Sequence, residues 1–393
     1  MTKVQYLFST PDGNIPAPET ILTKHIKQGK TLASDLTLKT YFDVLKQVIL
    51  ENWTKISLQS SDFTGDIKKL FIICEKCGLF YHVARARIIT QDSEEVSLAV
   101  ITAFDESSRN TLKRDHEILG HLWKARKLKM VPRPFFITDA LPVTGRQDLA
   151  VTVSIMEWLN DYHEWHFTRT AGQVPSFYIV TWQPGRGIVR LPEGFSEQLF
   201  ELISRILAYY FDPVHLFQIC LWSNPAGDFV VSWNNTGGLS ARLTTIRRYA
   251  KITGQTDNFD SNENLLTALL YLFLDTVLNI RLDRLDGTGR YFLAGHEFLL
   301  PTISGFFQGL SALFIETAIP REVMGQYVSL LKALSYQDLR ILYRPLMDFY
   351  RNEKRQETGF LENSLPLHCS QLASVLADMN FHDGTVPQVY LAA

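Results

Sequence analysis

The sequence predicts an α+β protein. We expect a small lobe with a mainly antiparallel five-stranded sheet and one packed helix, followed by a larger, mainly helical lobe with short β-hairpins. Two patterns predict this arrangement. Strand-like runs flank one helical run between residues 66 and 160, and runs with helical spacing fill most of the chain after residue 260. With 393 residues and 46% hydrophobic residues, the chain is long enough to bury a large core in two lobes.

The first 65 residues are expected to form an N-terminal extension with one amphipathic helix. Residues 1–35 are rich in Thr, Pro, Gly and Lys and lack sustained periodicity, so we interpret them as an irregular lead-in. Thr40–Trp53 carries apolar residues at helical spacing and predicts the helix. The polar run Ser60–Asp66 ends the extension.

Residues 66–160 are expected to form the small lobe. Five runs have the composition of strands: Lys69–Glu75, Phe80–Ile89, Val96–Phe104, Phe135–Ile137 and Asp148–Met156. Asp105–Lys129, between the third and fourth runs, has its apolar residues on one side and predicts a helix. Val131-Pro-Arg-Pro134 follows it, and proline cannot continue a helix. The first three runs should therefore form a meander.

Residues 161–393 are expected to form the larger lobe. A hairpin is predicted where Phe177–Trp182 and Ile188–Leu191 flank a Gln-Pro-Gly-Arg-Gly turn. Glu197–Tyr210 predicts a helix with Ser196 as its N-cap. Four more helices are predicted downstream: Glu263–Asp283, Ile303–Ala318, Arg321–Ala333 and Tyr336–Glu353. The last ten residues are expected to be a loose tail.

One segment of the larger lobe is a candidate for chemistry. In Asn224–Asn234 a tight turn leads into a short apolar strand, and Asp228 lies where the turn meets the strand. Ala241–Tyr249 predicts a second strand after a turn rich in Asn and Gly. The sequence thus predicts that the carboxylate of Asp228 is held on a loop at the mouth of a small hairpin.

The order of elements over residues 66–285, with four local matches, resembles the protein-kinase-like superfamily, including the aminoglycoside phosphotransferases. Gly227-Asp228-Phe229 resembles the catalytic loop, and Met156–Leu159 resembles the hinge that binds adenine through its backbone. Leu98–Thr102 resembles the strand with the phosphate-pairing lysine, and Glu117 resembles the helix glutamate that pairs with that lysine. The resemblance implies a catalytic Asp228 and the following cofactor-binding residues: Thr102, Glu117, Glu157, Leu159 and Arg247.

Several parts that the resemblance requires are missing. Thr102 stands where the lysine is expected, and Gly78 is the one glycine where a Gly-rich loop is expected. Ala226 and Trp233 occupy the positions of the catalytic-loop histidine and the metal-binding asparagine, and no Asp-Phe-Gly follows. ATP brings about four negative charges and needs Mg²⁺ and a lysine. ATP and magnesium, the cofactors that the resemblance implies, are therefore expected to bind weakly or not at all.

Three hypotheses about function follow. In the first, the chain is a kinase-like protein with a degenerate active site that acts by binding a protein partner. In the second, it is a divergent Mg-ATP-dependent phosphotransferase, in which Asp228 converges with Asp283 or Asp286 and with Arg247 or Arg85. In the third, it is an unrelated α+β binding protein and Asp228 only forms a turn. We favour the first, and the second ranks next.

Two further motifs each allow two interpretations. His163 and His166 would face one way on a helix, with Glu164 between them, and could bind a metal or perform acid–base chemistry. Histidines that pack or form hydrogen bonds are the favoured interpretation. Cys74 and Cys77 have the spacing of half a zinc site or of a thioredoxin-like motif, and structural cysteines at a strand end are favoured.

A charged run also follows the last residues of one predicted helix. Arg281–Gly289 contains alternating charges and two glycines. The favoured interpretation is a helix C-cap with a local ion-pair network, because the ligand spacing of a calcium loop is absent.

Composition excludes some classes of protein. The net charge of −2 provides no footprint for nucleic acid or an anionic membrane. No run of 18 apolar residues predicts a membrane span, and the N-terminus lacks an apolar signal region, so the cytoplasm is the expected location. The aromatic-rich segment Tyr162–Phe167 is the expected surface for a protein partner.

Overall fold

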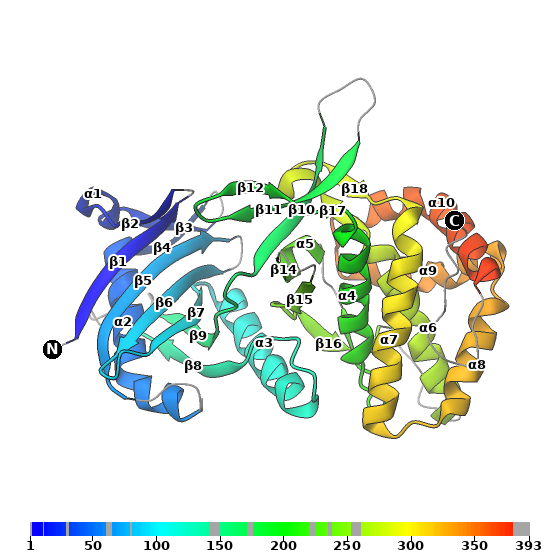
Figure 1. Cartoon of the computed structure of the whole chain (residues 1–393), viewed down its shortest axis with the longest axis horizontal. Coiled ribbons are helices and arrows are strands. Elements are labelled where there is room, and N and C mark those ends of the chain that lie inside the picture. Colours follow the sequence, from blue (N-terminus) through cyan, green and yellow to red (C-terminus); the bar gives the residue numbers. More distant parts are fainter. Residues whose placement is uncertain are drawn as a thin grey trace. The chain divides into compact units, whose positions relative to one another are not determined.

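The computed structural model describes residues 2–10, 12–28, 31–59, 65–78, 81–141, 150–170, 176–220, 225–234, 238–252 and 261–379. The chain divides into two compact units. The first contains Met1–Ala125, Val131–Asp161 and Gln183–Gly187, and the second contains Arg126–Met130, Tyr162–Trp182 and Ile188–Ala393. The chain therefore passes between the units several times. Each unit has sheet and helix of its own (Figure 1).

The first unit is built on a seven-stranded sheet in the order β2-β1-β5-β6-β7-β9-β8. Its strands are β1 (Lys3–Thr10), β2 (Gly13–Pro16), β5 (Ile67–Cys77), β6 (His82–Thr90), β7 (Glu95–Ala103), β8 (Pro134–Ala140) and β9 (Val151–Glu157). The five strands that the sequence predicts are neighbours in this sheet and pair antiparallel. The α+β class is thus confirmed, but the prediction of five strands misses two, because β1 pairs in parallel with β5 and β2 pairs with β1.

The expectation of an irregular lead-in at residues 1–35 is wrong. Besides β1 and β2, this stretch contains the short helix α1 (Glu19–Leu22) and a hairpin of β3 (His25–Gln28) and β4 (Thr31–Thr37). Every second residue of the middle of β1, namely Val4, Tyr6 and Phe8, packs on the core of the unit. Residues 1–65 therefore share one hydrophobic core with the sheet.

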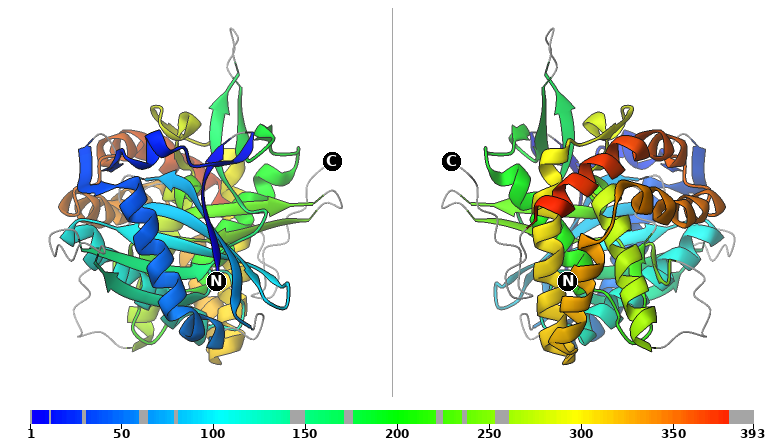
Figure 2. Two further views of the ribbon diagram at one scale, coloured as in Figure 1. Left: turned by 90° about the vertical axis from the view of Figure 1, so that its left-hand side faces the viewer. Right: turned by 90° about the vertical axis from the view of Figure 1, so that its right-hand side faces the viewer.

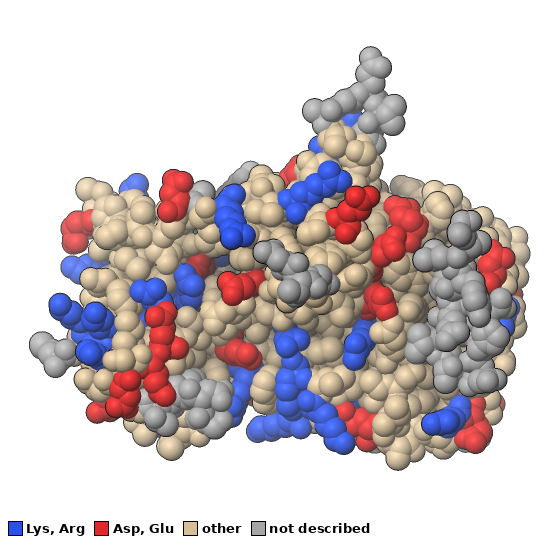
Figure 3. Space-filling view, viewed as in Figure 1, with Lys and Arg blue, Asp and Glu red and all other residues tan. Residues whose placement is uncertain are grey.

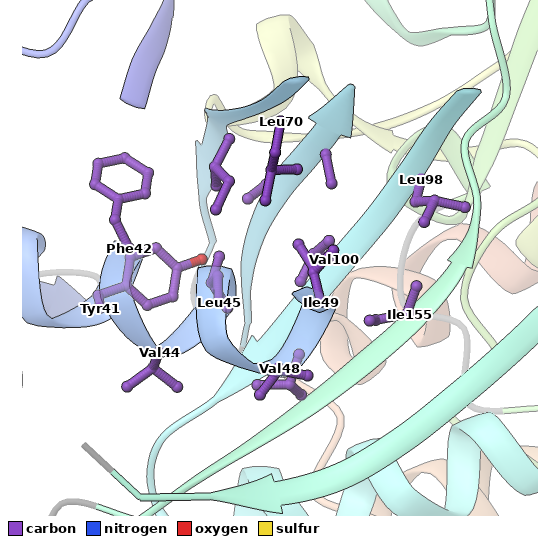
Figure 4. Packing of buried hydrophobic residues seen from close by; sticks show 14 of the residues in the cluster. Tyr41, Phe42, Val44, Leu45, Val48, Ile49, Leu70, Leu98, Val100 and Ile155 are labelled. Atoms are coloured by element: carbon purple, nitrogen blue, oxygen red, sulfur yellow. The ribbon is translucent and has the colours of Figure 1, made fainter. Parts of the chain in front are cut away.

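Helix α2 (Leu38–Leu58) covers one face of the seven-stranded sheet (Figure 2, left). Its buried side chains, among them Leu45 and Ile49, pack with Leu70, Val100 and Ile155 of the sheet (Figure 4). Burial of large aliphatic side chains of this kind contributes about 1.5–3 kcal/mol each. The amphipathic helix expected at Thr40–Trp53 is confirmed and extends further at both ends.

Helix α3 (Glu106–Ala125) packs against β7, β8 and β9. Its buried positions recur every three or four residues: Ser108, Leu112, Asp115, Leu119 and Leu122. The Nδ1 atom of His116 lies 2.8 Å from the Ser154 hydroxyl on β9. Ser154 alternates with Val153 and Ile155, which pack in the α2 core, so α3 and α2 lie on opposite faces of the sheet.

The second unit contains a five-stranded sheet in the order β12-β11-β10-β14-β15. Its strands are β10 (His163–Arg169), β11 (Phe177–Gln183), β12 (Gly187–Arg190), β14 (Phe229–Trp233) and β15 (Leu239–Leu243). Two small pairs accompany it, β13 (Gln218–Cys220) with β16 (Arg248–Ala250) and β17 (Leu282–Arg284) with β18 (Tyr291–Leu293). The predicted hairpin is confirmed as β11–β12, whereas the strand expected at Ala241–Tyr249 is divided between β15 and β16.

Helices make up most of the rest of the second unit (Figure 2, right). They are α4 (Phe195–Tyr209), α6 (Ser261–Asn279), α7 (Leu299–Thr317), α8 (Arg321–Lys332), α9 (Tyr336–Asn352) and α10 (Thr358–Asp378). The first five are confirmed predictions, and α10 was not predicted. The N-cap of α4 is Gly194, in the left-handed region, and not Ser196. The expected C-terminal tail lies outside the described residues.

Helix α7 packs very closely against α4. A Cβ atom at Gly305 would lie 1.9 Å from the main-chain oxygen of Glu201, and one at Gly309 would lie 2.4 Å from that of Arg205. Glycine is required at both positions because the backbones approach so closely. The stretch His296–Thr317, which contains α7, is long and apolar enough to cross a membrane, yet more than half of its apolar window is buried inside the protein, as in a core helix.

Candidate functional site around Asp228

Asp228 is the last residue of a short helix, α5 (Pro225–Asp228), which leads directly into β14. Its side chain is almost completely buried, with 1% exposed. Within the second unit, α5 lies against β10 and β17. The sequence thus correctly predicts a carboxylate at the mouth of the β14–β15 hairpin.

Two side chains hold Asp228 in place. The Nη2 atom of Arg247 lies 3.3 Å from Oδ1 of Asp228 and donates a hydrogen bond to it. The main-chain oxygen of Asp228 accepts hydrogen bonds from the amide of Thr244, at 2.8 Å, and from its hydroxyl, at 3.0 Å. A buried carboxylate is costly unless it is paired, and Arg247 supplies the compensating charge. Because the Arg247 side chain is 33% exposed, the pair lies at the edge of the interior.

The pairing with Arg247 restricts the chemistry of Asp228. A guanidinium that donates to the carboxylate occupies an oxygen that a general base or a metal ligand would use. It also repels a second cation, since two unit charges 4 Å apart interact by about 4 kcal/mol at an effective dielectric constant of about 20. The site as it stands therefore favours a structural carboxylate over a metal-binding one.

The strand after Asp228 also differs from a kinase catalytic loop. In that loop the aspartate and an asparagine five residues later act in one site. Here Phe229–Trp233 is an extended strand, so residue 233 lies about 16 Å from residue 228 at ~3.3 Å per residue. No residue at position 233 could share a metal ion with Asp228.

Thr102 lies on the sheet face that α2 covers. It pairs across the sheet with His82 and with Val153, and Val153 belongs to the α2 core. Cross-strand partners share a face, so Thr102 points toward α2, and it is fully buried. Ile101, the partner of Ser154, lies on the face toward α3. Thr102, expected to bind a cofactor, therefore lies beside the α2 core of the first unit.

Glu117 lies on the exposed side of α3. The buried carboxylate of this helix is Asp115, which accepts a hydrogen bond from the hydroxyl of Tyr81 at 3.0 Å. Asp115 lies three residues after Leu112 and four before Leu119, so the helical spacing of the sequence could have identified it. Glu117, expected to bind a cofactor, is therefore not the carboxylate that α3 directs to the sheet.

The residues of the expected hinge follow β9. The side chain of Glu157 accepts a hydrogen bond from the amide of Arg133 at 3.0 Å, and the amide of Glu157 donates to the main-chain oxygen of Arg133 at 2.8 Å. Leu159 is partly exposed. Glu157 therefore holds the start of β8 beside the end of β9. Like Thr102 and Glu117, both residues belong to the first unit, whereas Asp228 and Arg247 belong to the second.

Arg85, the other basic candidate, also belongs to the first unit and has partners there. Its Nε atom lies 2.9 Å from Oε1 of Glu75, and its guanidinium lies 5.1 Å from the ring centre of Trp158. These contacts are those of a half-buried sheet residue. Of the basic residues considered, Arg247 is the one that meets Asp228.

His163 and His166 lie on a strand and not on a helix, because they belong to β10. Residues three apart on a strand point to opposite faces, so these two imidazoles cannot bind one metal ion. His166 places its Nδ1 atom 3.2 Å from Oδ1 of Asp283. The interpretation of these histidines as hydrogen-bonding residues thus holds for His166. Trp165 and Phe167, expected at a partner surface, are buried instead.

Asp283 accepts two further hydrogen bonds, from the amides of Phe167, at 2.7 Å, and of Arg284. The buried Asp283 therefore links β10 to β17, and its partners are His166 and backbone amides rather than the neighbouring arginines. Asp286 is exposed, with a left-handed backbone. The expected local ion-pair network is replaced by these contacts, and neither aspartate joins Arg247.

A buried cluster that the sequence did not predict surrounds Arg281. Its guanidinium donates to the main-chain oxygens of Val277, Ala294 and Gly295 and to Nδ1 of His368. The Nε2 atom of His368 lies 2.7 Å from the hydroxyl of Tyr343. Burial, and then the charge of Arg281, hold the pKa of His368 well below 6.5, so the imidazole is neutral. This cluster joins the end of α6 to α9 and α10.

Metal-binding groups are not apparent in the described part of the chain. No three His, Cys, Asp or Glu side chains gather there in a way that could hold a metal ion. Cys74 lies within β5 and packs in the α2 core, as expected for a structural cysteine. On the face shown in Figure 3, basic and acidic side chains are interspersed, without a large field of one sign.

The chain matches no protein-family model, and no curated protein is significantly similar to it.

Proposed function

We propose that this chain is a kinase-like protein with a degenerate active site, which binds a nucleotide weakly or not at all and acts through a protein partner. The order of elements supports the kinase-like part. Three strands, a helix and two strands follow one another in the first unit, and the sheet order of these strands is β5-β6-β7-β9-β8. In the second unit, a short hairpin follows a buried carboxylate, as the resemblance requires.

The ion pair of Asp228 with Arg247 carries the proposal that the site is degenerate. Phosphoryl transfer needs cations that bridge the phosphate oxygens, held by carboxylates of the enzyme. Here the carboxylate is neutralised by an arginine of the same chain. Strand β7 has no lysine, and Thr244 and Thr245, with no carboxylate, follow β15. The parts that would recruit Mg-ATP are thus replaced or missing.

The other two hypotheses have less support. A divergent phosphotransferase would use the convergence of Asp228 and Arg247, but Arg247 would first have to leave the carboxylate. An unrelated binding protein would be favoured if the five predicted strands did not form one sheet, and they are neighbours in one sheet.

Two aromatic rings of the segment Tyr162–Phe167, those of Trp165 and Phe167, are buried, which leaves little of the segment's apolar surface for a partner. Large apolar side chains are exposed instead on the β11–β12 hairpin, where Trp182 is 43% and Ile188 is 76% exposed. Neighbouring exposed apolar side chains are typical of interaction sites. This hairpin is therefore the first place to look for a partner.

Thermal unfolding with and without Mg-ATP tests the proposal. We expect no change in the melting temperature at millimolar Mg-ATP. A nucleotide present at 100 times its dissociation constant would add about 2.7 kcal/mol to the free energy of unfolding, which is easily seen.

The opposite result would have a specific form. Stabilisation by Mg-ATP, together with phosphate transfer that Asp228→Asn abolishes, would replace the proposal with an active phosphotransferase. Asp286→Asn is the matched control, because Asp286 is exposed and asparagine accepts its left-handed backbone.

A further inference from the structure

A stacked pair of aromatic rings reaches the surface of the second unit beside the β10–β11 hairpin. Phe177, the first residue of β11, is 39% exposed. Its ring stacks on that of Phe292, from β18, with the ring centres 4.2 Å apart and the planes 29° from parallel. Phe292 is half-buried and also packs on the buried ring of Phe167. The core of the unit therefore holds the pair on one side, while Phe177 is open to solvent.

An arginine lies beside each ring of this pair. Arg169, the last residue of β10, is the cross-strand partner of Phe177, and such partners lie on one face with their Cβ atoms about 4.5–5.5 Å apart. The amide of Leu285 donates to the main-chain oxygen of Arg290 at 3.2 Å, which extends the β17–β18 ladder. Residues two apart in a ladder share a face, so Arg290 lies on the side of Phe292. Both arginines are exposed.

Neither arginine has an acidic partner. The guanidinium groups of Arg169 and Arg290 form no ion pair and no hydrogen bond with any residue that the structure describes. Asp286, in the turn before β18, is exposed and is not paired with Arg290, and the buried Asp283 is bound to His166 and to backbone amides. The sequence of residues 171–175, at the tip of the hairpin, contains no Asp or Glu. Two positive charges thus remain uncompensated beside an exposed aromatic surface.

This combination selects a ligand that is both acidic and aromatic. A guanidinium pairs with a carboxylate through two parallel hydrogen bonds, and a ring packs on a second ring. Arginine and aromatic residues dominate the binding energy of many protein interfaces for these reasons. A nucleic acid also combines rings with negative charge, but it requires a continuous basic surface. The chain has a net charge of −2, and both signs are interspersed on the face shown in Figure 3.

We propose that the cluster of Arg169, Phe177, Arg290 and Phe292 is a docking site for an acidic peptide segment of a protein partner. An aromatic side chain of that segment packs on Phe177, and carboxylates on either side of it pair with the two guanidinium groups. The inference rests on the proposed function and deepens it, because it gives the chemical class of the partner. The two fail separately. Stabilisation by Mg-ATP overturns the proposed function, whereas the binding of peptides decides the docking site.

Selection from a library of random peptides displayed on phage tests the chemistry of the ligand. The library is bound to the wild type and, in parallel, to the double variant Arg169→Glu/Arg290→Glu. We expect the peptides recovered with the wild type alone to carry Asp or Glu on both sides of an aromatic residue. Recovered peptides without this pattern, equal recovery with the two proteins, or recovery of no peptide would each overturn the proposal.

The affinity of one recovered peptide, measured by fluorescence anisotropy, tests the two arginines. We expect Arg169→Glu and Arg290→Glu each to raise the Kd about tenfold, because the reversal replaces an attraction with a repulsion. Arg321→Glu, at an exposed position of α8, is the matched control and should change the Kd by less than about twofold. Arg169→Gln and Arg290→Gln, with a smaller expected loss of affinity, serve if a charge reversal prevents folding.

The same measurement tests the ring. We expect Phe177→Ala to raise the Kd about fivefold, because the aromatic contact is lost. Leu367→Ala, at an exposed apolar position of α10, is the control and should leave the Kd unchanged. A Kd that responds to the arginines but not to Phe177 would reduce the cluster to a general attraction for acidic chains and contradict the docking site. Tighter binding of a short single-stranded oligonucleotide than of the peptide would reassign the cluster to nucleic acid.

Discussion

Two charged groups of the second unit are buried in opposite ways. Arg281 is sealed among carbonyl oxygens and the imidazole of His368, and 1% of it is exposed. Asp228 is equally buried, but its partner Arg247 is one-third exposed to solvent. The sealed cluster joins three helices, whereas the pair at Asp228 lies at the end of a small hairpin. Because the guanidinium of Arg247 is reached by water and that of Arg281 is not, we expect the loss of Arg281 to destabilise the fold more than the loss of Arg247.

The largest expected effect is the loss of the sealed cation. Arg281→Met leaves three carbonyl oxygens and His368 without a donor, and we expect the free energy of unfolding to fall by about 3–5 kcal/mol. Urea unfolding measures it. Arg351→Met is the control, because Arg351 forms ion pairs at the surface, and it should cost less than about 1 kcal/mol. Similar losses for the two variants would contradict a stabilising role of the sealed cluster.

The neutral histidines should make stability depend on pH. Burial lowers the pKa of His116 to about 4, and burial with Arg281 keeps the pKa of His368 well below 6.5. Below pH ~6.5 the unfolded chain binds more protons than the folded one. Stability is therefore complete above that pH, and each histidine removes up to about 1.4 kcal/mol per pH unit as the pH falls.

Urea unfolding at pH 7.5, 5.5 and 4.5 measures this slope. His368→Gln should flatten the slope by one histidine, because glutamine can still accept from Arg281 and donate to Tyr343. His116→Gln should remove the contribution that His116, in the first unit, makes to the dependence of the free energy of unfolding on pH. Identical slopes in the wild type and both variants would show that neither imidazole is kept neutral by the fold.

In the pair of His166 and Asp283, the imidazole is 22% exposed, which is less than the side chain of Arg247. A substitution at Gly287 tests how firmly this imidazole is held in place. A Cβ atom at Gly287 would lie 2.8 Å from Nε2 of His166, and the backbone there has φ +75°. Gly185 has the same φ with open space around it, so Gly185→Ala isolates the backbone strain. We expect Gly287→Ala to cost about 1 kcal/mol more than Gly185→Ala, because the imidazole must move. Equal unfolding midpoints would mean that His166 adapts freely.

The smallest expected change in the free energy of unfolding follows from removing Arg247, the partner of Asp228. Arg247→Met should lower the free energy of unfolding by only about 1 kcal/mol, because water reaches the position of the guanidinium. Urea unfolding compared with Arg281→Met checks the comparison directly. A loss at Arg247 as large as that at Arg281 would assign both pairs the same stabilising role.

Local patterns in the sequence were sufficient for much of the fold. The helical spacing of Thr40–Trp53 and the proline stop after Asp105–Lys129 predicted α2 and α3, although α3 ends earlier, at Ala125. The alternation of Val4, Tyr6 and Phe8 is also present in the sequence, but the surrounding residues have the composition of a loop and hide this signal of a strand.

The positions of the candidate site residues depend on geometry that the sequence does not specify. Asp228 was found because its turn and strand are adjacent in sequence. Thr102 lies on the face of the sheet that α2 covers and Ile101 lies on the other face, because successive residues of a strand point to opposite faces. On α3, Asp115 lies on the buried side of the helix and Glu117, two residues later, lies on the exposed side.

The sequence by itself determined the α+β class, the helices and strands with clear periodicity, and a carboxylate at the mouth of a hairpin. These depend on residues within a few positions of one another. Only the tertiary structure decided that Arg247 neutralises Asp228, that His368 is the acceptor for Arg281, and that Arg126–Met130 belongs to the second unit. Such partners are separated by up to 87 residues, and no local pattern specifies which distant side chains meet.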